Sequence, residues 1–182
     1  MYTITSYFQR VADVLPSIPA EPVDPIVGIL KDAQTNGRRI FMFAPGGSSA
    51  NASHLVNDFV KSVRVPGRPR MRVFCLSDNT PLLTALGNDI SYDVVFADPL
   101  AALAEPGDVA FALSGSGNSP NVLRAMEVAQ EMGLTRIGLT GRDGGALAPL
   151  CDVAVIVPTD SMQIIEDAHL VILHAIYLAL CE

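Results

Sequence analysis

The sequence predicts an α/β fold in which a parallel sheet of five strands is flanked by helices on both faces. Five short apolar runs have the length expected of strands, and helical patterns alternate with them along the chain. Strands that alternate with helices imply parallel strands joined by helical crossovers. Most glycine- and serine-rich turns directly follow a strand, so we expect them at the carboxyl edge of the sheet, where such folds bind ligands.

Two helices are predicted before the first strand. Residues 3–15 (TITSYFQRVADVL) form an amphipathic pattern, and a second helix is predicted over residues 26–36. Four prolines, at positions 16, 19, 22 and 25, break the chain between them. Residues 1–37 therefore form an N-terminal helical segment, and residues 38–182 form one continuous globular unit without an internal repeat or a linker.

The remaining elements follow in regular order. Strands are predicted at residues 39–44, 71–76, 109–113, 135–140 and 153–157. Helices are predicted after Ser48 and at residues 81–86, 99–104, 122–132 and 161–180. The longest apolar stretch, residues 168–180, lies in the last helix and contains two histidines. Because it is too short to span a bilayer, we interpret it as part of a core or interface helix.

Composition and charge limit the class of protein. A length of 182 residues fits one domain with a sizeable core. The formal net charge of −7 argues against a general nucleic-acid binder, which needs a basic face. Cys75, Cys151 and Cys181 lack the spacing of a metal knuckle, so they are interpreted as reduced thiols of a cytoplasmic protein. Residues 1–10 lack the pattern of a secretory signal, and no membrane partner is expected.

The most informative segment is residues 113–121 (LSGSGNSPN), a turn from a predicted strand into a predicted helix. Its glycines allow the backbone to approach a ligand closely, and the helix start offers free N–H groups with a partial positive charge. Ser114, Ser116 and Ser119 add hydroxyl donors. Together these features predict a phosphate cradle. The alternative is an ordinary glycine–serine turn with a serine cap.

A second glycine–serine turn, residues 44–49 (APGGSS), leads into a helix that carries His54 and Asp58 four residues apart, on one face. The last helix carries Glu166 and His174 on one broad side. If the two pairs converge, they suit a divalent metal such as zinc, or acid–base chemistry with a carboxylate base. Taken singly, each pair is more often a surface contact or a packed core histidine.

The order of these motifs resembles that of a sugar isomerase (SIS) domain. The motifs are GGSSANASHLVND, LSDNTPLLTALGND, GDVAFALSGSGNSPNVLRAME, IGLTGRDGGALA and IIEDAHLVILH. They are most similar to those of the phosphoheptose isomerases, which convert sedoheptulose 7-phosphate to D-glycero-D-manno-heptose 7-phosphate. The resemblance covers roughly residues 35–180 and implies a flavodoxin-like, three-layer α/β/α fold.

The resemblance also implies a role for individual residues. It implies that substrate is bound by Gly47, Ser48, Asp78, Ser114, Ser116 and Ser119. It implies a zinc ion held by His54, Asp58, Glu166 and His174. Asp58 would move the proton between C1 and C2 through an enediol, and His174 would be the acid–base partner at the oxygens. The bound zinc would stabilise the developing charge. No nucleotide cofactor is implied.

Three positions depart from the family pattern. Asp58 stands where the family has a glutamate, which withdraws the carboxylate by more than a bond length. Glu166 replaces a neutral glutamine and adds a negative charge. Pro45 replaces an asparagine before the glycine pair and removes a polar contact. The first two changes reshape the site, so the sugar phosphate used by this chain could differ from that of its relatives.

Other functions are compatible with the same domain. Related isomerases use N-terminal helices to assemble tetramers with active sites between subunits, and we expect such a homo-oligomer here. Some SIS modules are non-catalytic, either sensing sugar phosphates or associating with a replication initiator. The acid–base pair of Asp58 and His174 favours an enzyme, since a binding module does not need it. An isomerase of another sugar phosphate is the third possibility.

Three further features have simpler interpretations. The only basic cluster, formed by Lys61, Arg64, Arg68, Arg70 and Arg72, is interpreted as a solvated loop, or else as part of an anion site across a subunit contact. Asp143 is expected to shape a turn in which two glycines supply positive φ. His169 is expected to pack in the core rather than to support the site.

Overall fold

The computed structural model describes residues 3–182 and contains one five-stranded parallel sheet, which confirms the predicted fold class. The strands lie in the order β2-β1-β3-β4-β5, the order of a flavodoxin-like sheet. Their bounds are β1 (Arg39–Phe43), β2 (Arg72–Cys75), β3 (Val109–Ser114), β4 (Thr135–Gly141) and β5 (Val153–Val157). All five predicted strands are therefore present, each within two residues of its predicted bounds.

The helices also follow the predicted order. They are α1 (Ile4–Val14), α2 (Val23–Thr35), α3 (Gly47–Ser62), α4 (Thr80–Asp89), α5 (Ala97–Leu103), α6 (Pro120–Glu131) and α7 (Met162–Cys181). The predicted start of α2 at residue 26 was wrong, because Pro25 lies in the first turn, where a proline costs the helix little. Three short 3₁₀ turns, at residues 15–17, 92–94 and 148–150, were not predicted.

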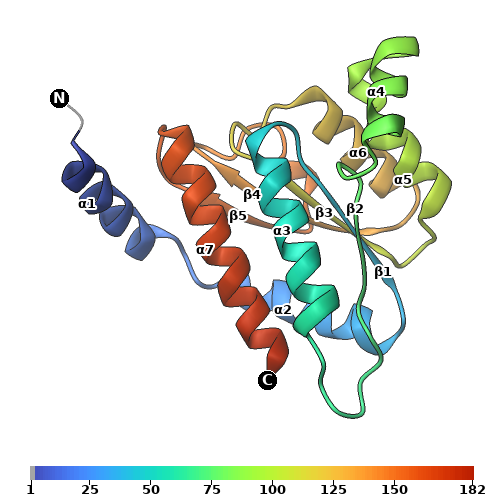
Figure 1. The fold of residues 1–182 in the computed structure, drawn as a ribbon, viewed down its shortest axis with the longest axis horizontal. Helices are drawn as coiled ribbons and strands as arrows, with labels where there is room; N and C mark the ends of the chain where they lie inside the picture. The colour runs from blue at the N-terminus through green and yellow to red at the C-terminus, as the bar shows by residue number, and fades with distance from the viewer. Residues whose placement is uncertain (1–2) are drawn as a thin grey trace.

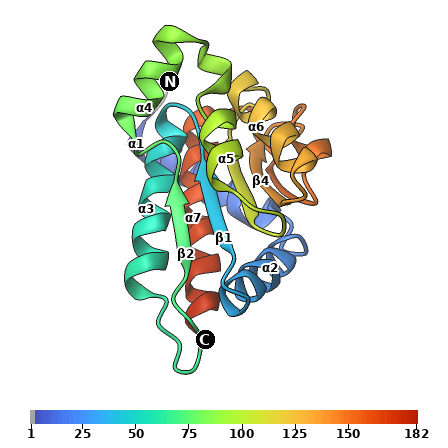
Figure 2. The ribbon, with the colours of Figure 1, turned by 90° about the vertical axis from the view of Figure 1, so that its right-hand side faces the viewer.

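The sheet is the middle of three layers (Figures 1 and 2). Side chains alternate along β1: Ile40 and Met42 join a core with α2, α3 and α7, whereas Phe41 and Phe43 join a core with α5 and α6. Burial on both faces explains why the strands are continuous apolar runs rather than alternating ones.

Helix α7 is the main cover of one face. It is 20 residues long, and by length and composition it could cross a membrane. Eight of its side chains are buried, and it packs against α2, α3 and the sheet (Figure 1). These contacts make it a core helix of this domain, as predicted.

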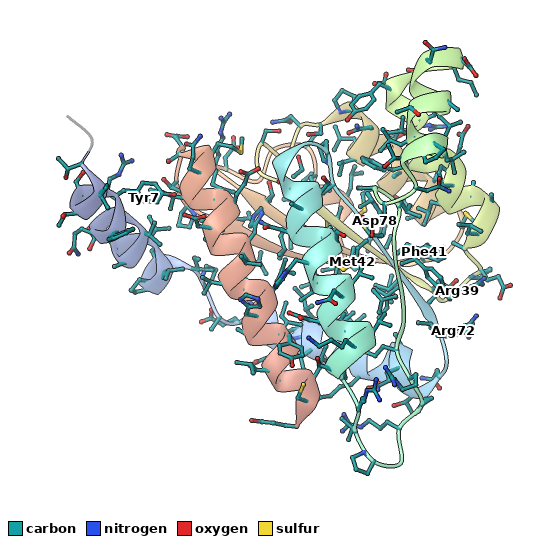
Figure 3. All side chains as sticks on the ribbon, viewed as in Figure 1. Tyr7, Arg39, Phe41, Met42, Arg72 and Asp78 are labelled. Atoms are coloured by element: carbon teal, nitrogen blue, oxygen red, sulfur yellow. The ribbon has the colours of Figure 1, made fainter. Side chains whose placement is uncertain are left out.

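Helix α1 extends from one side of the domain (Figure 1). Thr3 caps it with a reciprocal bond to Ser6, yet none of its side chains is buried, and Ile4 and Phe8 are 75% and 66% exposed. The Tyr7 hydroxyl donates to the Asp167 carboxylate of α7 at 2.5 Å, and Figure 3 shows this tyrosine reaching from α1 toward α7. Helix α1 thus presents apolar side chains that this chain leaves uncovered.

The basic cluster lies in and beside the loop that joins α3 to β2. Arg64, Arg70 and Arg72 each donate to a nearby backbone carbonyl, which holds the loop in place. This loop lies at the amino end of β2, opposite the glycine–serine turns. The structure therefore favours the interpretation of a solvated loop for this chain taken by itself.

Candidate active site

The two predicted glycine–serine turns meet at the carboxyl edge of the sheet and enclose a pocket of about 210 Å³, here called the serine pocket. One turn joins β1 to α3, and the other joins β3 to α6. The pocket is lined by Pro45, Gly46, Gly47, Ser48, Ser114, Gly115, Ser116, Ser119, Met162 and Glu166. The structure thus brings together five of the six residues predicted to bind substrate.

Both helices that begin at the serine pocket lack a side-chain cap. Gly46, with φ 56°, is the N-cap residue of α3, and Ser119 is that of α6; neither forms a side-chain capping bond. The Ser119 hydroxyl lies 3.1 Å from the Ser114 hydroxyl instead. Two helix starts therefore converge on one pocket, and each contributes a partial positive charge. At α6, Pro120 has no N–H and the Asn121 side-chain oxygen accepts the Val122 N–H at 2.9 Å. This arrangement suits an oxyanion.

The turn between β3 and α6 depends on glycine. Gly117 has φ 65°, and a Cβ there would lie 2.3 Å from the Gly144 carbonyl oxygen. Gly144 belongs to the turn after β4, where the Asp143 carboxylate accepts the Gly145 N–H at 3.1 Å. The predicted role of Asp143 in shaping that turn is confirmed. Close backbone packing between the two turns leaves no room for a side chain at Gly117.

A second group of residues lies further along α3. His54 Nε2 is 3.3 Å from Asp58 Oδ2 and 3.0 Å from His174 Nε2, and the two rings meet edge to face. The predicted i,i+4 pairing on α3 is confirmed, and α7 supplies the third member. Asp58 is 16% exposed, whereas the histidines are 46% and 45% exposed, so solvent reaches this His–Asp–His cluster from the histidine side.

The geometry of the His–Asp–His cluster fits a metal ion. One ligand atom from each residue lies within 4.8 Å of the others. A tetrahedral zinc with bonds of about 2.0–2.1 Å holds its ligand atoms about 3.3 Å apart. The three separations here are 3.0 Å, 3.3 Å and, between His174 Nε2 and Asp58 Oδ2, 3.9 Å. Two imidazoles and one carboxylate, with solvent on one side, match the donor set of catalytic zinc sites that keep an open position.

Glu166 does not join this cluster in the structure. Its Oε1 accepts the Ser48 hydroxyl at 3.3 Å, so the carboxylate lies in the serine pocket. Glu166 and His174 both contact α3, as their spacing predicts, but they stand about two turns apart on α7, a helix rise of about 12 Å. The four predicted ligands therefore form a three-residue cluster and one separate carboxylate.

Asp78, the sixth predicted substrate residue, follows β2. It lies outside the lining of the serine pocket, and its carboxylate accepts the Ser53 hydroxyl at 3.2 Å. Ser53 precedes His54 on α3, so Asp78 lies beside the first turns of that helix (Figure 3). Asp78 therefore lies at the carboxyl edge of the sheet, outside the serine pocket.

Two residues near the site were not predicted. The Asn51 amide donates to the Glu166 main-chain carbonyl at 2.9 Å and ties α3 to α7. Asn51 is three residues after Ser48, so the two lie on the same face of α3. This spacing could have indicated from the sequence that Asn51 is near the site. Met162 lines the serine pocket because α7 begins there, and no local pattern indicates that contact.

His169 has the predicted packing role. It is fully buried on α7, and burial lowers its pKa to about 4, so the ring is neutral at pH 7. Its Nε2 lies 3.2 Å from the Thr140 carbonyl at the end of β4, to which the neutral ring donates. This bond fixes α7 to the strand end that supports the serine pocket.

Comparisons with known proteins identify the family. Residues 6–141 match the SIS domain. The chain is 35% identical to a phosphoheptose isomerase from Trichlorobacter lovleyi over 92% of its own length and 83% of the relative's. It is 42% identical to one from Solidesulfovibrio magneticus over 85% and 75% of the two lengths. The chain belongs to the phosphoheptose isomerase family of SIS-domain proteins.

The fold agrees with that of solved phosphoheptose isomerases. The structure of one from Neisseria gonorrhoeae superimposes with a TM-score of 0.89 at 31% identity, covering 97% of this chain and 96% of that one. A phosphoheptose isomerase from Francisella tularensis gives a TM-score of 0.90 at 26% identity, over 97% and 95% of the two chains. The resemblance expected from the motifs is therefore confirmed across almost the whole chain.

Proposed function

We propose that this chain is an aldose–ketose isomerase that interconverts sedoheptulose 7-phosphate and D-glycero-D-manno-heptose 7-phosphate. The supporting observation is that one helix, α3, carries Ser48 of the serine pocket and His54 of the His–Asp–His cluster. Six residues separate them, which is about 9 Å of helix rise. That spacing suits a ligand with its phosphate at one end and its reacting carbons at the other.

The serine pocket is assigned the phosphate. The hydroxyls of Ser48, Ser114, Ser116 and Ser119 would donate to its oxygens, together with the N–H groups at the starts of α3 and α6. Hydrogen bonds to a charged acceptor are stronger than neutral ones. Because the phosphate takes no part in the proton transfers, these contacts act by positioning the substrate.

The His–Asp–His cluster is assigned the proton transfers. Asp58 would take a proton from one of C1 and C2 and return it to the other, through an enediol. His174, which lies beside Asp58 in the cluster, would move protons at the two oxygens. A carboxylate base with a neighbouring imidazole is the pairing that such chemistry requires.

A zinc ion is proposed at this cluster, with His54, Asp58 and His174 as its ligands. When bound, zinc would supply a Lewis acid that polarises the sugar carbonyl. Glu166 remains a predicted fourth ligand, although its carboxylate lies in the serine pocket. Elemental analysis of protein purified without a histidine tag should find about one zinc per chain, and the Asp58→Asn variant should lose it.

A homotetramer is proposed with active sites between subunits. Within the N-terminal helices assigned to residues 1–37, α1 has exposed apolar side chains, whereas α2 buries Ile26 and Leu30 in the core of the unit assigned to residues 38–182. Assembly is therefore assigned mainly to α1. Light scattering should give a tetramer, and the Phe8→Ser variant should shift it toward smaller species. A monomeric parent chain would contradict this proposal.

We also propose that the protein is cytoplasmic and acts on a small phosphorylated substrate. No nucleic-acid or membrane partner is proposed. All three cysteines are free. Burial raises the pKa of Cys75 to about 11 and that of Cys151 to about 12, so both are stable as thiols at neutral pH.

The test is an assay with sedoheptulose 7-phosphate, with and without added zinc, in which NMR follows formation of the aldose. Appearance of the manno-configured heptose phosphate supports the proposal. Absence of turnover in both metal states would overturn it. A thermal-shift panel of sugar phosphates would then separate an isomerase of another sugar phosphate, which one panel member should reveal as substrate, from a non-catalytic binding module.

A further inference from the structure

The first turn of α7 lies directly on the ends of two strands because glycines make room for it. A Cβ at Gly115, which follows β3, would lie 2.5 Å from Met162 Sδ. A Cβ at Gly141, the last residue of β4, would lie 2.4 Å from Ile165 Cδ1. Apolar contacts of this kind have no preferred direction. They hold the helix close to the sheet, but they do not set its position along its own axis.

His169, one turn further along α7, provides the directional contact. Its Nε2–H donates to the Thr140 carbonyl at 3.2 Å, and Thr140 pairs with Ser114 in the register of β3 and β4. Within residues 3–182, no other side-chain hydrogen bond joins α7 to a strand; the remaining ones join it to α1 and α3. Because a hydrogen bond weakens steeply away from its preferred length and angle, this one fixes α7 along the strand ends.

The same ring has a buried atom without a partner. His169 is fully buried, and within residues 3–182 its Nδ1 has no hydrogen-bond partner. Leaving a buried acceptor unpaired costs about 1–3 kcal/mol, whereas a typical hydrogen bond contributes about 0.5–1.5 kcal/mol. The unpaired Nδ1 therefore offsets the stability that the bond to Thr140 contributes. An apolar side chain of similar volume would pack here equally well, so stability alone does not explain a histidine.

The position of α7 matters for the proposed chemistry. His174 follows His169 by five residues, about 7.5 Å of helix rise, and α7 lies beside α3, which carries Asp58 (Figure 1). Proton transfer requires hydrogen-bond reach, and a displacement of about 1 Å can lower a rate about 100-fold. The serine pocket depends less on α7, which supplies only Met162 and Glu166 to its lining.

We propose that His169 is a positioning residue for the isomerisation, whose bond to Thr140 sets the axial position of α7 and so places His174 for proton transfer. His169 does not touch the substrate and acts through the helix, in addition to its packing role. The inference rests on the proposed function, because it takes His174 as a group that moves protons.

The test compares two substitutions of His169, with zinc present in every assay. His169→Leu fills the space but has no donor for Thr140. We expect its kcat to fall at least about 30-fold with KM within about three-fold, while the free energy of unfolding changes by less than about 1.5 kcal/mol. His169→Gln carries an amide N–H that reaches the position of Nε2, and it should keep kcat within about five-fold of the parent chain.

Leu100→Ala is the control for stability. Leu100 is fully buried on α5, in the core on the opposite face of the sheet from α7. The cavity should cost about 2–4 kcal/mol in the free energy of unfolding, more than His169→Leu, yet kcat at 25 °C should stay within about two-fold. A kcat loss in Leu100→Ala as large as that in His169→Leu would overturn the inference, because the loss would then follow stability.

Unchanged kcat in His169→Leu would also overturn the inference, and so would equal losses in the leucine and glutamine variants, since the donor would then have no role. Turnover by the parent chain and by Asp58→Asn separates these results from a failure of the proposed function. If the parent chain does not turn over the sugar phosphate, both proposals fail. If it does, Asp58→Asn is inactive and His169→Leu is fully active, only the positioning role is rejected.

Discussion

The serine pocket and the His–Asp–His cluster lie on the same helix but are built in different ways. The pocket is formed by turns whose shape depends on glycine, with the starts of α3 and α6 pointing into it. The cluster is formed by side chains from the middles of α3 and α7, and its histidines are nearly half exposed. The comparison suggests that backbone geometry fixes the binding end, whereas side-chain identity determines the chemistry. Substitutions in the cluster should therefore lower kcat, whereas substitutions in the pocket should change the stability of the chain or the KM for substrate.

The largest effect is expected at the cluster. Asp58→Asn should lower kcat by about 1,000-fold or more with little change in folding, because it removes the proposed base and, with it, a proposed zinc ligand. Asp58→Glu is the informative partner, since it restores a carboxylate that is one methylene longer, and it should keep far more activity. Steady-state kinetics with the sugar phosphate measures both. Equal activity of Asp58→Asn and the parent chain would remove Asp58 from the mechanism.

A glycine substitution at the pocket should act on stability instead. Gly117→Ala places a Cβ 2.3 Å from the Gly144 oxygen at φ 65°, and we expect a loss of about 3 kcal/mol in the free energy of unfolding. Gly133→Ala is the matched control, because its φ is 73° but no atom lies within 4 Å of the added Cβ. That control should lose only about 1 kcal/mol. Urea denaturation of both variants gives the comparison, and equal losses would show that the turn has room for a side chain.

The buried His169, which joins α7 to β4, should make the stability of the fold sensitive to pH. Burial lowers the pKa of His169 to about 4 in the folded chain, whereas the unfolded chain keeps a value near 6.5. The unfolded state therefore binds more protons between these values, so His169 costs no stability above pH 6.5 and destabilises the fold as pH falls. From pH 7 to pH 5 the loss should be about 2 kcal/mol. His169→Gln should show a shallower pH dependence of urea unfolding; the same slope as the parent chain would refute this account.

The smallest effect is expected from a single pocket hydroxyl. Ser116→Ala should raise KM about ten-fold and leave kcat within about two-fold, because contacts to the phosphate are the same before and during the reaction. Ser49→Ala provides the control, since its hydroxyl donates to the Gly46 carbonyl and does not line the pocket. A fall in kcat with unchanged KM for Ser116→Ala would place that hydroxyl among the reacting groups.

The two regions also differ in how far the sequence could predict them. The strands, the turns and the His54–Asp58 pair follow from local patterns, since the periods of strands and helices determine which residues share a face. The position of Glu166 depends on how α7 is set against α3, and that offset comes from packing between residues more than 100 positions apart. The spacing within α7 correctly predicted that Glu166 and His174 share one side of that helix. It could not predict which residues of α3 they contact. The Asn51 and Met162 contacts depend on the same packing.

Helix capping in this chain has a consequence for its stability. Thr3 caps α1 and Asn79 caps α4 with their own side chains, whereas the other five helices of residues 3–182, among them α3 and α6 at the pocket, begin without a bond from the N-cap side chain. An uncapped helix start is commonly worth about 1 kcal/mol less than a capped one. A bound oxyanion would accept from N–H groups at the starts of α3 and α6, so ligand binding would add to the stability of the chain. Its melting temperature would then rise with ligand concentration, and its stability in a cell would follow the supply of its substrate.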